Sequence, residues 1–257
     1  MRVATWNVNS IKVRADQVLA WSARHAPDVL CLQEIKKVDE GFPVQRFADA
    51  GYTAAVAGQK TYNGVAILAK GPLADVVVGF ADGAEEDPQR RLIRATYRGV
   101  RIVDCYVPNG DEVGTEKYAY KLKWLPRLRA ALDAQESPDR PLVIVGDFNV
   151  APEPIDVHKP DRWEGKVLFS APERAALADV RAFGLEDCVR KHHPEEGLFT
   201  WWDYRLKAWE RNWGLRIDHV FATKPLAARC TSSFVDREVR ANVQPSDHVP
   251  VAADFDV

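Results

Sequence analysis

Residues 141–150 read PLVIVGDFNV, and this stretch decides how the fold is interpreted. Its residues 142–145 form an apolar, largely β-branched run, which is typical of a strand buried on both faces. Gly146 interrupts the run, and Asp147 and Asn149 follow two residues apart, a spacing that points both side chains the same way. A carboxylate and a carboxamide at the end of a buried strand can orient a water molecule or a hard cation.

The bulk composition is that of a globular protein, with 257 residues, 46% hydrophobic and 28% charged. We expect a single domain over residues 1–257. We find no apolar stretch that could cross a bilayer and no signal peptide, so we expect a cytoplasmic protein without a membrane segment. The net charge of −2 means that any nucleic-acid site must be a local patch rather than a global property.

The cysteines show no spacing typical of a metal site. Two of them lie inside apolar runs that read as strands. We therefore expect reduced, mostly buried thiols at all of these positions: Cys31, Cys105, Cys188 and Cys230.

Hydrophobic periodicity predicts many strands and a few long helices. The expected helices cover residues 10–25, with Ser10 as the capping residue, 115–135 and 172–183. The expected strands cover residues 2–6, 28–33, 53–57, 65–69, 74–78, 92–97, 101–107, 142–145, 216–222 and 249–255. No linker separates the two halves, and the pattern fits a sandwich of two sheets covered by helices.

A polar group stands at the end of almost every expected strand. If these strands lie side by side, the polar groups gather at one rim of the sandwich; they are Asn7, Glu34, Tyr106, Asp147, Asn149, Asp218, Asp247 and His248. Each residue alone is more often a turn former, a solvated residue or a packing residue. Their joint occurrence favours a catalytic site.

The collected groups suit phosphodiester hydrolysis. Mg²⁺ prefers oxygen ligands and needs only one or two carboxylates besides a substrate phosphate. A histidine paired with an aspartate can hold one tautomer and hydrogen-bond or protonate a phosphate. An aspartate and an asparagine together can place the attacking water in line with the leaving group.

The same motifs occur, in the same order, in a known family. The chain resembles the exonuclease III family of apurinic/apyrimidinic (AP) endonucleases, within the endonuclease/exonuclease/phosphatase superfamily. The motifs that carry the resemblance are Trp6-Asn7-Val8-Asn9-Ser10, Leu32-Gln33-Glu34, Tyr106-Val107-Pro108-Asn109-Gly110, Gly146-Asp147-Phe148-Asn149, Gly214-Leu215-Arg216-Ile217-Asp218 and Ser246-Asp247-His248-Val249-Pro250. This resemblance implies a four-layer αββα sandwich with two mixed sheets packed face to face.

The resemblance also implies site roles. Glu34 resembles the main metal ligand, and the metal-binding set it implies is Asn7, Glu34, Asp147, Asn149, Asp247 and His248. Asp147 resembles the residue that orients or deprotonates the attacking water, and the catalytic set is Tyr106, Asp147, Asn149, Asp218 and His248, with Asp218 bracing His248. Positions that look DNA- or phosphate-facing are Asn9, Lys36, Arg90 and Asn109. Asp156 fits either a loop anchor or a DNA contact, and for His219 a buried neutral imidazole is expected.

The segment 199–215 separates a DNA repair enzyme from relatives that act on other phosphate esters. It is rich in aromatic residues and interleaves them with the cations Arg205, Lys207 and Arg211. Rings and cations together suit a damaged strand whose sugar is flipped out of the stack. The residues that match the family's sugar pocket or adjoin it are Trp201, Trp202 and Leu215, whereas at least one of Trp209 and Trp213 is expected to pack the sandwich.

We therefore expect a monomeric, Mg²⁺-dependent DNA repair nuclease, for which Mn²⁺ is an alternative metal. It would incise duplex DNA 5′ to an abasic site, and it would clean blocked 3′ ends and trim DNA in the 3′→5′ direction. One alternative is a phosphatase or phosphodiesterase that acts on a lipid or a small molecule. The other is a DNA-binding protein with an inactive metal centre, which the complete set of polar strand ends disfavours.

Overall fold

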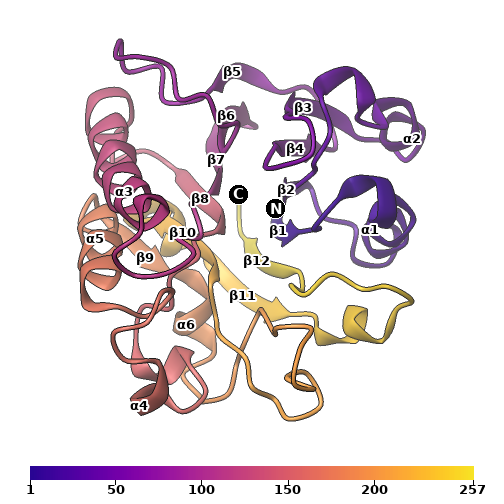
Figure 1. Ribbon diagram of the computed structural model, residues 1–257. Coiled ribbons are helices and arrows are strands. Elements are labelled where there is room, and N and C mark those ends of the chain that lie inside the picture. Colours follow the sequence, from indigo (N-terminus) through magenta and orange to yellow (C-terminus); the bar gives the residue numbers. More distant parts are fainter.

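Two six-stranded sheets form the centre of the computed structural model, which describes residues 1–257 (Figure 1). The first sheet has the order β11 (Cys230–Val235), β12 (Val251–Phe255), β1 (Arg2–Asn7), β2 (Val29–Gln33), β4 (Val65–Ala69) and β3 (Thr53–Ala57). The second has the order β5 (Ala74–Val78), β6 (Leu92–Tyr97), β7 (Val100–Tyr106), β8 (Leu142–Asp147), β10 (Asp218–Thr223) and β9 (Leu185–Asp187). Both sheets mix parallel and antiparallel neighbours.

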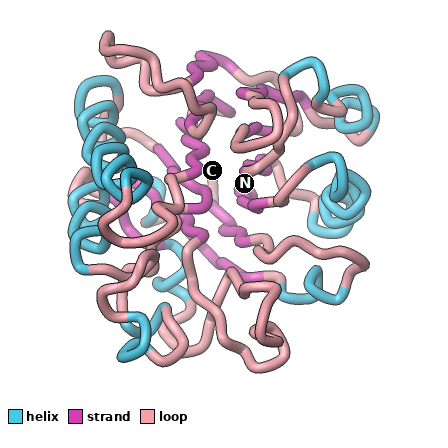
Figure 2. Tube along the Cα trace, in the orientation of Figure 1, coloured by secondary structure: helices cyan, strands magenta, loops and turns pink.

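Helices cover the outer face of each sheet, as Figure 2 shows by colour. The first sheet is covered by α1 (Ile11–His25) and α2 (Val44–Asp49), and the second by α3 (Glu116–Gln135) and α5 (Ala171–Arg181). The shorter helices are α4 (Pro160–Trp163), α6 (Cys188–His192) and α7 (Lys224–Ala227). The predicted four-layer αββα sandwich is confirmed. None of the helices is long and apolar enough to span a bilayer.

Alternating strand residues build the layers, because successive side chains of a strand point to opposite faces. In β8, Val143 and Val145 pack in the cluster between the sheets, while Leu142 and Ile144 pack outward in the cluster that contains α3 and α5. Both faces of the strand are therefore apolar, which explains the uninterrupted run in the sequence.

Strand direction brings the polar strand ends to one rim. β1 pairs in parallel with β2, so that Asn7 lies opposite Gln33, and β7 pairs in parallel with β8, so that Tyr106 lies opposite Asp147. Antiparallel β10 begins at the same rim, where Asp218 lies opposite Asp147. The carboxyl ends of four parallel-paired strands and the amino end of β10 thus meet.

Several local predictions need correction. Ser10 precedes α1 with φ +96° and makes no side-chain capping bond; instead its amide donates to the Glu34 carbonyl at 2.8 Å. The last strand begins at Val251 rather than at residue 249, after Pro250, which has no N–H to donate. The sequence analysis missed the two edge strands β9 and β11, because one is very short and the other carries polar residues, Thr231, Ser232 and Ser233. All four cysteines are buried and free.

Candidate active site

Three side chains from three strand ends converge at the rim. Glu34 follows β2, Asp147 ends β8 and His248 precedes β12, and the atoms that they offer to an ion lie within 4.8 Å of one another. The chain positions that supply them are far apart, so only the sandwich brings them together. The two carboxylates offer the oxygen ligands that suit a hard divalent cation, and the imidazole lies beside them.

Asp147 lies at the bottom of this cluster and is 1% exposed. Its Oδ2 accepts hydrogen bonds from the side-chain amides of Asn7 at 2.9 Å and Asn149 at 3.2 Å, and its Oδ1 accepts from the backbone amide of Asn149 at 2.9 Å. Burial raises the pKa of Asp147 to about 7, and the neighbouring Asp218 and Glu34 carboxylates add to the effect. The positive charge of His248 opposes this rise and offsets part of the repulsion among the three acids.

His248 is held by a buried carboxylate. Its Nδ1 lies 2.9 Å from Asp218 Oδ2, and Asp218 in turn accepts a hydrogen bond from the Thr200 hydroxyl at 2.6 Å. Its Nε2 therefore faces the cluster, 3.6 Å from Asp147 Oδ2. Burial disfavours the imidazolium, but the Asp218 and Asp147 carboxylates outweigh it and raise the pKa of His248 to about 10.

The raised pKa of His248 predicts that the folded state loses stability as the pH rises above neutrality. The folded-state pKa lies above the ordinary value of 6.5, so the contribution is fully present below 6.5 and is lost as the pH rises through about 10. In EDTA, we expect the Tm of the wild type to fall more between pH 7 and pH 10 than the Tm of His248→Asn. Equal falls in thermal melts of the two proteins would contradict the paired imidazolium.

Glu34 has three polar side chains as partners in the cluster. Its Oε1 accepts from Asn7 at 2.8 Å and from the Tyr106 hydroxyl at 2.9 Å, and its Oε2 lies 2.8 Å from the Lys36 ammonium. Burial would raise the pKa of Glu34, but Lys36 and the hydrogen bond from Asn7 outweigh it and lower the pKa below its usual range. Glu34 is thus an ionised carboxylate, as an ion ligand must be.

Comparison with known proteins agrees with this geometry. The family model described as the endonuclease/exonuclease/phosphatase family matches residues 4–248. The chain belongs to this family. It is 35% identical to an exodeoxyribonuclease III of Haemophilus influenzae, over 99% of this chain and 100% of that protein. The predicted membership of the exonuclease III family is therefore confirmed, and so is the prediction of a hydrolase.

Solved structures lead to the same family. An AP endonuclease from Archaeoglobus fulgidus is 42% identical and superposes with a TM-score of 0.96, and all of both chains is covered. A 3′ phosphatase from Neisseria, solved with a product DNA hairpin, is 40% identical with a TM-score of 0.95, again with full coverage of both chains. The exonuclease III resemblance thus extends over the whole sandwich.

The side chains of three further predicted metal ligands, Asn7, Asn149 and Asp247, form hydrogen bonds in and around the cluster. The side-chain N–H groups of Asn7 and Asn149 point at the carboxylates, so these residues position the acids. Both carboxylate oxygens of Asp247 are engaged, one by Asn9 Nδ2 at 3.1 Å and the other by the Trp201 indole N–H at 3.0 Å. The convergent carboxylates are therefore Glu34 and Asp147.

The predicted DNA-facing residues Asn9 and Lys36 form one network with these acids. Lys36 Nζ donates to Asn9 Oδ1 at 2.5 Å as well as pairing with Glu34. Asn109 is exposed, and its side-chain amide donates to Asn149 Oδ1 at 2.9 Å. Both asparagines and the lysine therefore lie at the rim, in contact with residues of the cluster.

Arg91, next to the predicted Arg90, is the arginine that contacts Tyr106 of the site. Arg90 pairs with Glu86 on the surface, whereas the Arg91 guanidinium lies 4.5 Å from the centre of the Tyr106 ring and donates to its carbonyl at 3.3 Å. Arg91 also lines a cavity of about 570 Å³ beside Tyr106 and Asn109. Because the two arginines are adjacent and chemically identical, the sequence does not show which of them contacts Tyr106.

The aromatic segment divides into a buried part and an exposed part. Trp202, predicted to contact substrate, has a fully buried side chain that packs edge-on against Trp209. Leu215 is also fully buried and supports Trp201 from below, so it does not form an open pocket wall in this conformation. Trp201 remains half-buried beside His248, and Arg205 is 84% exposed.

A cavity of about 600 Å³ adjoins this segment, between the loop after Trp201 and α4. Its lining combines the rings of Trp163, Trp201 and Trp213 with the cations Arg162, Lys166 and Arg205. Rings and cations on one surface match the character of a nucleic-acid strand.

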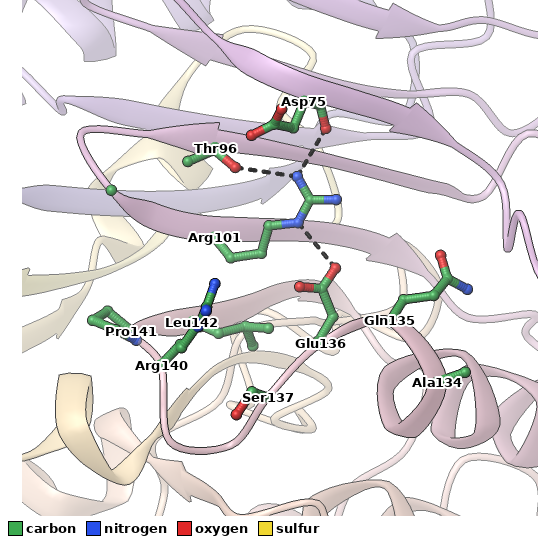
Figure 3. Close-up of a pocket in the computed structure, with 11 residues that line it drawn as sticks. Asp75, Thr96, Arg101, Ala134, Gln135, Glu136, Ser137, Arg140, Pro141 and Leu142 are labelled. Carbon is green, nitrogen blue, oxygen red and sulfur yellow. Dashed lines mark hydrogen bonds and ion pairs between the residues drawn. The ribbon is translucent and has the colours of Figure 1, made fainter.

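A further cavity, of about 630 Å³, lies at the opposite end of the second sheet (Figure 3). It is lined by the first residues of β7 and β8, and Arg101 bridges it with contacts to Glu136 at 3.0 Å and to Thr96 at 3.3 Å. Arg101 is already paired with Glu136 there, and the catalytic cluster lies at the far ends of the same strands. This cavity is therefore separate from the candidate active site.

Buried His219 is neutral, as expected. The Arg216 guanidinium, which can only donate, lies 3.0 Å from Nδ1 of His219, so Nε2 carries the proton and donates to the Val150 carbonyl at 2.9 Å. Burial, with Arg216 adding to it, lowers the pKa of His219 to about 3. The residue connects β10 to the loop that follows Asn149.

Proposed function

We propose that this protein is a metal-dependent nuclease of DNA base excision repair, which hydrolyses the phosphodiester 5′ to an abasic site and also removes or trims nucleotides and blocking groups at 3′ ends. The observation that carries the proposal is the convergence of Glu34, Asp147 and the Asp218-braced His248 beside Trp201. The relatives are consistent with it, since they include an exodeoxyribonuclease III, an AP endonuclease and a 3′ phosphatase.

The proposed cofactor is Mg²⁺, with Mn²⁺ as a substitute. Glu34 and Asp147 would hold it, because their carboxylates converge and offer the oxygen ligands that this ion prefers. When bound, a divalent cation neutralises charge that develops on the phosphate oxygens and stabilises the leaving oxygen. Glu34 is kept ionised by Lys36, and no proton needs to leave it.

The other residues of the cluster have distinct proposed roles. Asp147, with a pKa near neutrality, holds and deprotonates the attacking water, and Asn149 fixes the carboxylate by two hydrogen bonds. His248 presents Nε2–H to the scissile phosphate while Asp218 holds its other nitrogen. Tyr106, stacked under Arg91, directs its hydroxyl at Glu34 and borders the phosphate path.

The proposed substrate is duplex DNA that carries an abasic site or a blocked 3′ end. Exposed Arg205 and the cavity cations Arg162 and Lys166 supply phosphate contacts, so binding should weaken with salt and show little sequence preference. An abasic sugar can leave the stack at low cost, and Trp201 offers it an apolar face. We further propose that the protein acts as a monomer in the cytoplasm.

The first test uses end-labelled duplex DNA with one tetrahydrofuran abasic analogue, beside an undamaged duplex. We expect a single nick 5′ to the analogue with Mg²⁺, none with EDTA, and none with Glu34→Ala, because a main ligand is lost. Glu238→Ala, at an exposed surface ion pair, is the matched control and should cleave like the wild type.

Other results would redirect the proposal. If the 3′ end of the undamaged duplex is degraded while the analogue stays intact, the protein is an exonuclease without specificity for abasic sites. If neither duplex is cut and small phosphate esters are hydrolysed, DNA is not the substrate.

Substitutions of Trp201 separate its ring from its N–H. We expect Trp201→Ala to slow cleavage at the analogue by about 5- to 30-fold, from the loss of ~1–2 kcal/mol of apolar contact with the sugar. Trp201→Phe keeps a ring but removes the hydrogen bond to Asp247, so its loss should be smaller. Trp209→Phe, in the packing part of the segment, is the control. Equal rates for Trp201→Ala and the wild type would remove Trp201 from the substrate site.

A further inference from the structure

Lys121 is a fully buried ammonium group directly behind the active site. It lies on α3, and its side chain is 0% exposed. Its Nζ donates to the backbone carbonyls of Asn109 at 3.0 Å and Asn149 at 2.6 Å, and it forms an ion pair with Glu173 of α5. All three donors of the ammonium are thus used, two of them on the loops that follow β7 and β8.

Glu173 is equally enclosed, and its other contacts belong to its own helix end. It accepts from the backbone amides of Leu168 at 3.1 Å and Ser170 at 3.0 Å, and from the Ser170 hydroxyl, in a capping box at the start of α5. A capped helix end does not by itself need a buried lysine. Buried ion pairs cost desolvation and are often replaced by apolar residues without loss of stability. The pair therefore calls for a reason other than stability.

The reason lies in the two backbone carbonyls that Lys121 also binds, those of Asn109 and Asn149. Asn109 and Asn149 point their side chains to the rim, where Nδ2 of Asn109 donates to Oδ1 of Asn149 at 2.9 Å and Asn149 contacts Asp147. Asn149 has φ +50°, outside the regular strand, and the residue after Asn109 is Gly110 with φ +96°. Both loops have thus left the sheet ladder, and Lys121 bonds the carbonyl of each.

We propose that Lys121 is a positioning residue, which holds Asn109 and Asn149 in register so that their side chains fix the Asp147 carboxylate. It acts from the side away from the substrate and contacts no reacting atom. This inference rests on the proposed function, because the asparagines are taken to serve nuclease turnover. Displacing such groups by about 1 Å can slow turnover by up to about 100-fold.

Two single variants and their combination separate positioning from charge balance. Lys121→Met leaves the Glu173 carboxylate buried without its partner, so both the Tm and kcat should fall, with kcat about 10- to 100-fold lower and little change in KM. Glu173→Gln keeps the ammonium on both carbonyls, so the Tm should fall while kcat stays near the wild-type value. The double variant Lys121→Met/Glu173→Gln removes both charges, so the Tm should recover in part and kcat should stay low.

A spectroscopic readout makes the test independent of the assay. The side-chain amide ¹⁵N–¹H signals of Asn109 and Asn149 should shift in Lys121→Met and in the double variant, and should stay in place in Glu173→Gln. Lys123→Met, exposed on the same helix, is the control and should change none of these quantities.

The results separate the two proposals. A wild type that cleaves no DNA, with the expected signal shifts, defeats the nuclease proposal alone. A kcat that follows the Tm across all variants, or asparagine signals that stay in place without Lys121, shows that Lys121 only neutralises Glu173 and overturns the inference.

Discussion

Asp147→Asn should lower kcat on abasic duplex DNA by about 10²- to 10⁴-fold, the usual contribution of a general base. The substitution keeps the shape of the side chain but removes the group that accepts the proton from water. The folded state should not suffer. Because burial and the nearby Glu34 and Asp218 carboxylates raise the pKa of Asp147, a neutral amide relieves repulsion, and the Tm in EDTA should equal or exceed that of the wild type.

Asp104→Asn is the matched control for that variant. Asp104 is a fully buried acid on the neighbouring β7, and burial raises its pKa well above the usual range, which favours its neutral form. It accepts a hydrogen bond from Gln33 at 2.6 Å, which an asparagine oxygen can also accept. We expect near wild-type turnover. Single-turnover kinetics in which Asp147→Asn cleaves as fast as Asp104→Asn would exclude Asp147 as the base.

Arg216→Met should lower the free energy of unfolding by about 3–5 kcal/mol, the cost of leaving a buried charge without its partner. The guanidinium is 1% exposed and binds Asp156 through two bonds of 2.7 and 3.2 Å, and it contacts Asp187 at 2.9 Å. Asp156 is fully buried, so of its two predicted roles the loop anchor holds. For a chain of this size the Tm should fall by about 6–20 °C.

The pH dependence of this loss distinguishes it from a packing defect. Burial opposes ionisation of Asp156 and Asp187, but Arg216 lowers the pKa of both, together with Arg190 at Asp156. Their contribution is present above the ordinary carboxyl pKa and is lost as the pH falls through the folded-state pKa. The gap in Tm between the wild type and Arg216→Met should therefore narrow on acidification from pH 7. Arg24→Met, at an exposed ion pair with Glu238, should leave the Tm nearly unchanged. An equally small change in Arg216→Met would refute the stabilising role of the buried network.

The catalytic cluster could be predicted from sequence because its signal is local. A buried strand reads as an apolar run, and a polar residue directly after it must lie at a sheet rim, whichever strands are neighbours. Asp147 and Glu34 follow such runs, and His248 precedes one. Ordered family motifs then supplied the layer architecture, which the paired sheets confirm.

Side chains whose position depends on distant packing could not be predicted in this way. Trp201 and Trp202 are adjacent and chemically alike, yet one borders His248 and the other fills the core, because neighbouring residues of an extended segment face opposite sides. Arg90 and Arg91 are a second adjacent pair: Arg90 pairs with Glu86 on the surface, and Arg91 contacts Tyr106. The alternation of side chains along an extended segment means that adjacent residues face opposite sides. Which of the two is buried depends on the sheets and helices that pack around the segment.

The sequence by itself determined the acids that gather at one rim, because they depend on residue type and short spacing. Its ordered motifs carried the resemblance that implied the family and the four layers. Only the tertiary structure decided which of these acids converge, that Asn7 and Asn149 serve them as donors, and that Lys121 lies behind them. The physical reason is that a hydrogen-bond network joins residues distant in the chain. Its geometry follows from how the sheets and helices pack, and no local pattern records it.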